Sequence, residues 1–368
     1  MNWKRIPESQ GWIQGIGEWA IRQHTFMPRM IDLEVSRVCN LSCPTCTRRA
    51  DSSLAQVGKE TPFRTLEGFK EVYKQIPTIG TLNFMGDGEP LMNPELNDII
   101  HYASLNDIYT VVTTNATLLN SQIIYRWTKD KVYKVHASVD AANKELYESV
   151  RVGAEWGKTY ENLKLLGKSG IPLCINVVLT EKTIGGMLDI VRLAKEVGAR
   201  EVTYLMPICT YGDDRGFRPY ANMRNKQMFI DTHKLCRELE VKWVFPLELH
   251  PTFRRLSFPF IRPQISIEGD LYACCYTLGR GKVWFEGYEY EVPSYNMGNM
   301  FKEGFKEVWY NDGYKEIRKI YKETEIRKGT AISREELLRR TKEIMEDPNS
   351  GRYDHCKICQ ARWGVACS

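Results

Sequence analysis

The sequence predicts an α/β protein whose main domain is an open, partial (β/α)6 barrel of the TIM type. Between residues 31 and 206, short apolar segments of strand length alternate six times with longer segments of helical spacing. Such alternation indicates a parallel sheet with helices packed outside it. A closed barrel needs eight such units, so this one is expected to stay open. After about residue 215 the alternation stops, which indicates a second, smaller region.

The expected elements follow in chain order. Turn residues support their ends, because Ser169-Gly170 precedes Pro172 and Gly198 follows Val197. The expected strands cover 31–35, 81–85, 108–113, 134–139, 173–179 and 201–206, and the expected helices cover 66–75, 94–104, 121–129, 156–168 and 186–197. Because parallel strands point the same way, their carboxyl ends should form one edge that carries the functional loops.

The rest of the chain is divided where this pattern changes. Residues 1–30 carry tryptophan and isoleucine at helical spacing and are expected to form a helical extension of the core at 31–215. Residues 216–254 are predicted to be a helical linker, and residues 255–368 a small α+β domain. That domain is expected to contain short strands within 264–272 and 284–292, and helices at 301–326 and 333–346.

The composition disfavours several classes of protein. With 43% hydrophobic and 26% charged residues, the chain is expected to be globular rather than disordered. No apolar segment approaches the roughly 20 residues that span a bilayer, and no apolar signal sequence follows Met1. A net charge of +5 without a Lys/Arg cluster does not favour nucleic-acid binding. A cytoplasmic protein that does not associate with membranes is therefore expected.

Eleven cysteines carry more information than the composition. Without an export signal, clustered cysteines indicate metal binding or catalysis rather than disulfides. Cys174, Cys209 and Cys236 stand singly and are interpreted as small, buried apolar residues. The other eight form two sets, one near the start of the chain and one near its end.

The first set has the spacing Cys39-x3-Cys43-x2-Cys46 and follows the first expected strand. Three thiolates on one short loop can bind three irons of a [4Fe–4S] cluster and leave the fourth iron without a protein ligand. A structural zinc site is the alternative, but it would need a fourth Cys or His nearby. The next residues, Thr-Arg-Arg-Ala at 47–50, provide neither.

This loop, together with Gly86-Asp-Gly-Glu-Pro90 after the second strand, resembles the radical S-adenosylmethionine (radical SAM) superfamily over residues 30–210. The resemblance implies that S-adenosylmethionine binds the open iron and is cleaved reductively to a 5′-deoxyadenosyl radical. One position departs from the family. Thr45 stands before the third cysteine, where relatives often have an aromatic residue near adenine.

The resemblance also implies which residues bind the cofactor. Gly88, Glu89 and Pro90 match the turn that binds the methionine amino group, and Asn115 matches a segment that holds sugar or substrate. Ser138, Asp140 and Arg151 match the fourth-strand end that meets the carboxylate and ribose, and Met206 matches a backbone contact to adenine. Each has a structural alternative: the turn could be an ordinary one, Asn115 an ordinary loop residue, and Ser138, Asp140 and Arg151 a local hydrogen-bonded network.

The second set resembles the auxiliary-cluster domains called twitch and SPASM over residues 255–368. Cys274, five residues after Gly269, and the pair Cys356 and Cys359 match ligands of an auxiliary [4Fe–4S] cluster. The cysteine expected before that glycine is missing from 254–260, so the fourth ligand is predicted to be Cys275, with Cys367 as the alternative, or that iron is open. A zinc site of Cys274, Cys275, Cys356 and Cys359 remains the competing interpretation.

The expected function is hydrogen abstraction from a substrate, followed by a dehydrogenation or another oxidative modification. A small polar metabolite is favoured as the substrate, because no peptide-binding domain precedes residue 30. The alternatives are radical modification of a peptide or protein side chain, and a non-catalytic iron–sulfur or zinc protein. An electron donor such as flavodoxin or ferredoxin is expected as a partner, and no catalytic residue can be named from the sequence.

Overall fold

The computed structural model describes residues 27–46, 62–205, 226–244, 262–273, 282–285, 288–291 and 296–323, together with residues 339 and 343. The helical extension predicted at 1–30 and the helix predicted at 333–346 therefore lie almost wholly outside the described residues. Among the helices in the described ranges, none is both long enough and apolar enough to cross a bilayer.

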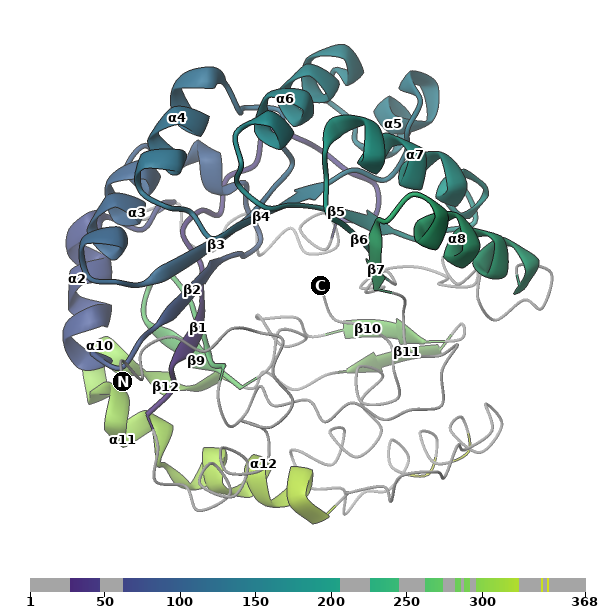
Figure 1. Ribbon diagram of the computed structural model, residues 1–368. Helices are drawn as coiled ribbons and strands as arrows, with labels where there is room; N and C mark the ends of the chain where they lie inside the picture. The colour runs from purple at the N-terminus through teal and green to yellow at the C-terminus, as the bar shows by residue number, and fades with distance from the viewer. Residues whose placement is uncertain are drawn as a thin grey trace.

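A ten-stranded sheet organises the described part of the chain. Its central strands are β1 (Met30–Leu33), β2 (Thr81–Phe84), β3 (Tyr109–Thr114), β4 (Lys134–Ser138), β5 (Leu173–Val178) and β6 (Glu201–Leu205). Each pairs in parallel with the next along the chain, and the sheet curves into an open barrel (Figure 1). The predicted α/β partial barrel is confirmed.

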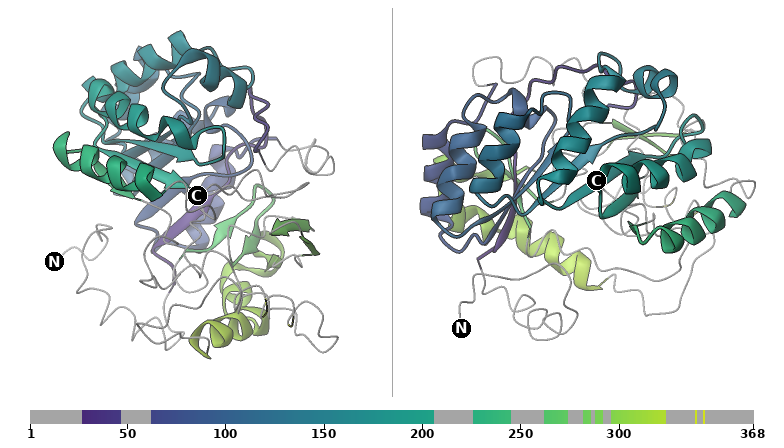
Figure 2. Two further views of the ribbon diagram at one scale, coloured as in Figure 1. Left: turned by 90° about the vertical axis from the view of Figure 1, so that its right-hand side faces the viewer. Right: turned by 45° about the horizontal axis from the view of Figure 1, so that its top comes forward.

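Helices line the outer side of this curved sheet (Figures 1 and 2). Thr65, Asn120 and Asn143 begin three of them by accepting a hydrogen bond from a first-turn backbone N–H. The helices are α2 (Leu66–Gln75), α3 (Leu96–Leu105), α4 (Ser121–Lys129), α5 (Lys144–Val150), α6 (Trp156–Lys168) and α7 (Met187–Val197). All except α5 match predicted helices to within two residues at each end. The sequence did not predict α5, because its 7 residues are too few to establish a helical period.

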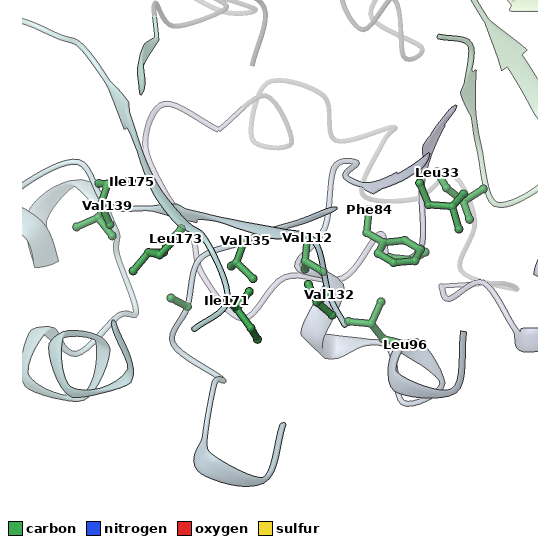
Figure 3. Close-up of a cluster of buried hydrophobic side chains, with 14 of the residues drawn as sticks. Leu33, Phe84, Leu96, Val112, Val132, Val135, Val139, Ile171, Leu173 and Ile175 are labelled. Atoms are coloured by element: carbon green, nitrogen blue, oxygen red, sulfur yellow. The ribbon is translucent and has the colours of Figure 1, made fainter. Parts of the chain in front are cut away.

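The two faces of each barrel strand have opposite chemistry. Residues that face the helices are buried and mostly apolar, and Figure 3 shows Leu33, Phe84, Val112, Val135 and Ile175 among them. The intervening residues face the barrel interior, because side chains alternate along a strand. Most of these are polar: Asp32, Asn83, Thr113, His136, Ser138, Asn176 and Thr203. Closed TIM barrels fill this space with branched apolar side chains, so this interior is of a different kind.

Residues 226–244 extend the barrel, although the sequence predicts only a helical linker there. Helix α8 (Lys226–Glu238) packs against α7 and leads into β7 (Lys242–Val244), which pairs in parallel with β6. A three-residue strand is too short for its alternation to be recognised in the sequence.

The other edge of the sheet belongs to the C-terminal region. Strand β8 (Gln264–Ile265) pairs in parallel with β1 and antiparallel with β9 (Asp270–Tyr272), which in turn pairs with β12 (Asn296–Asn299). Two further strands, β10 (Lys282–Phe285) and β11 (Tyr288–Glu291), form a separate antiparallel pair. The region is α+β as predicted, but it shares a sheet with the barrel, and the division into domains stays a prediction.

Three helices replace the single one predicted at 301–326. They are α10 (Met300–Glu303), α11 (Phe305–Trp309) and α12 (Asp312–Glu323). Gly304 separates the first two with a backbone φ of +93°, a conformation that a helix cannot contain. The apolar spacing continues across the break, so the sequence pattern alone did not reveal it.

Gly167 allows the packing of α6 against the end of α7 to be tested. A Cβ at Gly167 would overlap the Val197 carbonyl oxygen, whereas a Cβ at Gly157 on the same helix would meet no atom within 4 Å. Because overpacking forces elements apart, Gly167→Ala should lower the free energy of unfolding by about 1–3 kcal/mol. Gly157→Ala should leave it unchanged or raise it by about 0.5 kcal/mol. Urea unfolding checks this, and equal stability of the two variants would contradict the packing.

Candidate active site at the carboxyl edge of the barrel

The loop after β1 carries the first cysteine set at the edge where the barrel strands end. The turn after β2 holds this loop, because the Glu89 N–H donates to the Val38 carbonyl oxygen at 2.8 Å. A Cβ added at Gly88 would overlap the Ser36 carbonyl oxygen and lie 2.7 Å from that of Val38. The close approach of the two backbones therefore requires glycine at this position.

The three thiols of this loop differ in exposure. Cys43 is buried, whereas Cys39 and Cys46 are partly exposed. The Cys46 N–H donates to the Cys43 carbonyl oxygen at 3.1 Å and closes a turn between them. Burial raises the pKa of the Cys43 thiol, and the Arg151 guanidinium opposes this rise. A nearby cation favours the thiolate, which is the form that binds metal.

The chemistry of these cysteines fits an iron–sulfur cluster, because thiolates are the ligands that hold the iron of such clusters. Within the described ranges, no three Cys, His, Asp or Glu side chains are placed to hold one ion. In a [4Fe–4S] cluster each thiolate binds a different iron, so the three sulfurs need not converge on one point. The donor set of Cys39, Cys43 and Cys46 therefore suits three irons of such a cluster.

Glu89 lies in the glycine-rich turn and is only 2% exposed. Its Oε1 accepts hydrogen bonds from Thr114 Oγ1 at 2.6 Å and from the Leu91 N–H at 3.1 Å, and its Oε2 accepts one from the Asn115 N–H at 2.7 Å. Burial raises the pKa of Glu89, and the bonds from Asn115 and Thr114 oppose this rise. The carboxylate thus ties the turn after β2 to the end of β3, and its contact with a cofactor amino group stays a prediction.

Asn115 joins the end of β3 to the cysteine loop. Its Nδ2 donates to Asn40 Oδ1 at 3.0 Å, and its Oδ1 accepts from Thr117 Oγ1 at 2.7 Å. Asn40 Nδ2 donates in turn to Thr117 Oγ1 at 2.9 Å, which closes a triangle beside Cys39. Neither Asn40 nor Thr117 was predicted as a site residue from the sequence, although Asn40 is adjacent to Cys39, a predicted ligand.

Asp140 and Arg151 form a buried ion pair beside Cys43, with Arg151 Nε 2.7 Å from Asp140 Oδ2. Asp140 Oδ1 accepts from the Val178 N–H at 2.8 Å, which ties the loop after β4 to β5. Burial lowers the pKa of Arg151, but Asp140 and the Cys43 thiol outweigh this and raise it. Ser138 lies at the end of β4, partly exposed.

The remaining predicted site residues lie outside the described ranges. They are Met206, Cys274, Cys275, Cys356, Cys359 and Cys367, and the single Cys209 lies outside as well. Cys174 and Cys236 are fully buried, as predicted. Cys174 is in polar surroundings, however, because its Sγ lies 3.3 Å from Thr203 Oγ1 and 3.5 Å from Glu201 Oε1.

The first part of the chain matches a known family. Residues 33–194 match the model of the radical SAM superfamily. This part of the chain is a radical SAM domain. Residues 258–360 match the model of the SPASM domain, an iron–sulfur cluster-binding domain. This radical SAM chain is therefore an enzyme, and its two domains imply a [4Fe–4S] cluster with S-adenosylmethionine and an auxiliary iron–sulfur cluster.

Curated relatives of this radical SAM chain include several enzymes. An AdoMet-dependent heme synthase of Methanosarcina barkeri is 26% identical over 78% of this chain and 83% of its own length. The mycofactocin maturase MftC of Mycobacterium ulcerans is 24% identical over 49% of this chain and 48% of its own length. The PqqA peptide cyclase of Bradyrhizobium diazoefficiens is 26% identical over 47% of this chain and 45% of its own length.

Solved structures show the same fold. SuiB of Streptococcus suis, bound to S-adenosylmethionine, aligns with 93% of this chain and 75% of its own at a TM-score of 0.62 and 17% identity. The enzyme anSMEcpe with bound AdoMet aligns with 90% of this chain and 96% of its own at a TM-score of 0.61 and 15% identity. At these identities the likeness confirms the fold of the radical SAM barrel with its C-terminal region.

The ion pair of Asp140 and Arg151 leads to a stability prediction. Asp140→Ala would leave a buried guanidinium without its carboxylate, so we expect it to lower the free energy of unfolding by about 3–5 kcal/mol. Asp189, which pairs with Arg192 on the exposed side of α7, provides the matched control. Asp189→Ala should cost at most about 1 kcal/mol. Urea unfolding of both variants tests this, and a loss below about 1 kcal/mol for Asp140→Ala would contradict it.

The cysteines lead to a second prediction, on thiol reactivity. Burial raises the pKa of Cys174 to about 12 and that of Cys236 to about 11. At pH 8 only about 1 in 10⁴ Cys174 side chains would be the reactive thiolate. Iodoacetamide should therefore modify the partly exposed Cys39 and Cys46 of the metal-free protein first, and Cys174 and Cys236 only after denaturation. Mass spectrometry of protein digests gives the order in which the cysteines are labelled. Early labelling of Cys174 would argue against its buried position in β5.

Proposed function

We propose that this radical SAM enzyme oxidatively modifies a polar substrate that binds inside the barrel, below the cysteine loop. The observation that carries the proposal is the polar interior. Thr113, His136, Asn176 and Thr203 occupy neighbouring positions on β3 to β6, and each is partly exposed, whereas the helix-facing residues beside them are buried. An exposed polar row inside a barrel can bind a substrate through hydrogen bonds.

The row is held in a defined arrangement by bonds between strands. His136 Nδ1 lies 3.2 Å from Asn176 Oδ1, which orients the imidazole across β4 and β5. Cys174 Sγ donates to the same oxygen at 3.5 Å from deeper in β5. Side chains fixed in this way lose little freedom when they bind a ligand.

A charged group lies on the other side of the interior. Arg262 Nε donates to Asp32 Oδ1 at 2.6 Å, and Asn83 Nδ2 donates to the same oxygen at 2.9 Å. Burial raises the pKa of Asp32, and Arg262 opposes this rise. Arg262 belongs to the C-terminal region, so that region contributes a cation to the interior next to β1 and β2.

S-adenosylmethionine bound to the first cluster would supply the 5′-deoxyadenosyl radical that abstracts a hydrogen atom from the substrate. The residues of the chain would bind and orient the substrate so that one C–H bond faces the cofactor. We propose that the methionine moiety binds to the backbone at Gly88, Glu89 and Pro90 and to the Arg151 guanidinium. Asn115 would hold sugar or substrate, Ser138 and Asp140 would meet the ribose, and the backbone of Met206 would contact adenine. Flavodoxin or ferredoxin is the proposed electron donor.

The auxiliary [4Fe–4S] cluster is the proposed acceptor of the electron that the substrate radical loses. Cys274, Cys275, Cys356 and Cys359 are its proposed ligands, with Cys367 as the alternative fourth ligand. The match to the SPASM model over residues 258–360 includes the first four of these. This assignment makes the reaction a net oxidation of the substrate.

We propose a small metabolite with carboxylate or hydroxyl groups as the substrate, because the interior offers both an arginine and neutral hydrogen-bonding groups. A relative that matches 78% of this chain is named a heme synthase, and heme is itself a carboxylated small molecule. A peptide substrate is the second candidate, because MftC and the PqqA peptide cyclase are named for peptide maturation. Those relatives match less than half of this chain.

Anaerobic reconstitution tests this function. The protein should bind about eight irons in two clusters, and 5′-deoxyadenosine formation should be stimulated by a carboxylated metabolite rather than by peptides. Asn176→Leu, which removes the amide between His136 and Cys174, should abolish the stimulation but keep the iron. Asn106→Leu, at the carboxyl end of α3 and away from the barrel interior, is the control and should change neither the stimulation nor the iron content. Stimulation by a peptide alone would favour the second candidate, and no 5′-deoxyadenosine at all would refute the function.

A further inference from the structure

A group of charged side chains connects the cysteine loop to the C-terminal region. Arg37, two residues before Cys39, binds both carboxylate oxygens of Glu268 through its two terminal nitrogens. The same guanidinium binds Glu34 Oε2, from Nε at 3.1 Å and from a terminal nitrogen at 2.9 Å. We call Arg37, Glu34 and Glu268 the Arg37 fork. It joins positions 231 residues apart in the sequence.

Each end of the fork lies near a predicted iron ligand in the sequence. On the barrel side, Arg37 and Cys39 share the short loop that Gly88 and Glu89 hold through Ser36 and Val38. On the other side, Glu268 lies in the turn between β8 and β9, and β9 leads directly to Cys274. The fork is therefore the side-chain connection between the loop of the first cluster and the strand that precedes the second set of cysteines.

Further bonds make the surroundings of the fork rigid. Glu34 Oε2 accepts from the Ile267 N–H at 3.2 Å, and Arg64 donates to the carbonyl oxygens of Glu34 and Ser266. Asn299 Nδ2 donates to the Glu268 carbonyl oxygen at 2.9 Å. Because both backbones are fixed close to the fork, a displacement of Glu268 is transmitted to Arg37 rather than absorbed by the turn.

We propose that Arg37 is a positioning residue that couples the C-terminal region to the first cluster, so that the placement of Glu268 controls how well the cysteine loop presents its open iron. The planar guanidinium is suited to this role because it fixes the distance and the orientation of a carboxylate at the same time. A lysine would keep the charge but not the two-point geometry. Arg37 does not contact the substrate or the cofactor in this assignment.

The test uses full-length protein with both clusters reconstituted anaerobically. The variants are Glu268→Gln and Arg37→Lys, and the controls are Glu316→Gln on the exposed side of α12 and Arg192→Lys on the exposed side of α7. S-adenosylmethionine is titrated into reduced protein while the electron paramagnetic resonance spectrum is recorded. Because the cofactor binds the open iron, the change that it causes reports on the first cluster.

We expect both fork variants to need about threefold more S-adenosylmethionine, or more, for half of the spectral change. Both controls should titrate as the unmodified protein does. Wild-type titration of Glu268→Gln at full iron content would overturn the proposal, since the fork is the contact through which Glu268 is proposed to act on the first cluster. If circular dichroism shows that Glu268→Gln does not fold, Arg37→Lys takes its place in the titration. Wild-type titration of Arg37→Lys at full iron content would then overturn the proposal.

A second measurement needs neither cluster. Urea unfolding of the metal-free protein with Arg37→Gln, Glu268→Gln and both substitutions gives the interaction between the two residues. A residue pair that acts as one connection should give effects that are clearly not additive. Additive effects would show that the two ends are independent, and they would overturn the proposed coupling even if iron loading were normal.

Discussion

Each barrel strand must bury one face against a helix, and this requirement determines which residues remain available for chemistry. Burial of the helix-facing valines, leucines and isoleucines stabilises the fold by about 25 cal/mol for each Å² of apolar surface. The opposite face of the same strands can then be polar, provided that its groups find partners. They do so across neighbouring strands, as Asn83 does with Asp32 and His136 with Asn176. The polar interior thus depends on the apolar layer outside it.

At the carboxyl edge, buried acids serve mainly as scaffold. Glu89 and Asp140 each bind groups from neighbouring strand ends and thereby hold three loops together around the cysteines. Hydrogen bonds from N–H and O–H donors offset part of the cost of burying such a carboxylate, which would be larger without them. The thiols are left as the reactive groups of this edge, which is consistent with chemistry performed by a bound cofactor.

The sequence was sufficient for the barrel, because strand and helix periods are local patterns, whereas the three iron ligands on the first loop stay a prediction. Strand and helix periods identified the six units to within one or two residues, and the spacing of Cys39, Cys43 and Cys46 indicated the cluster. Relations between distant segments were not accessible. No local pattern shows that Asn40 meets Asn115, that Arg37 meets Glu268, or that β7 joins the sheet. The polar row occupies every second position of β4 to β6. It was not recognised in the sequence, because the apolar residues between these positions dominate the strand pattern.

The position of β8 beside β1 has a consequence for how the protein folds. Contacts at this junction, such as that between Arg262 and Asp32, join residues 230 positions apart. Closing so long a loop costs entropy before any contact compensates for it, and such topologies fold slowly. During synthesis the ribosome delivers β1 long before β8, so the nascent barrel carries β1 with its outer backbone groups unpaired by β8. Such an edge can pair with other chains, and the protein therefore depends on its C-terminal region to protect the sheet as well as to complete the site.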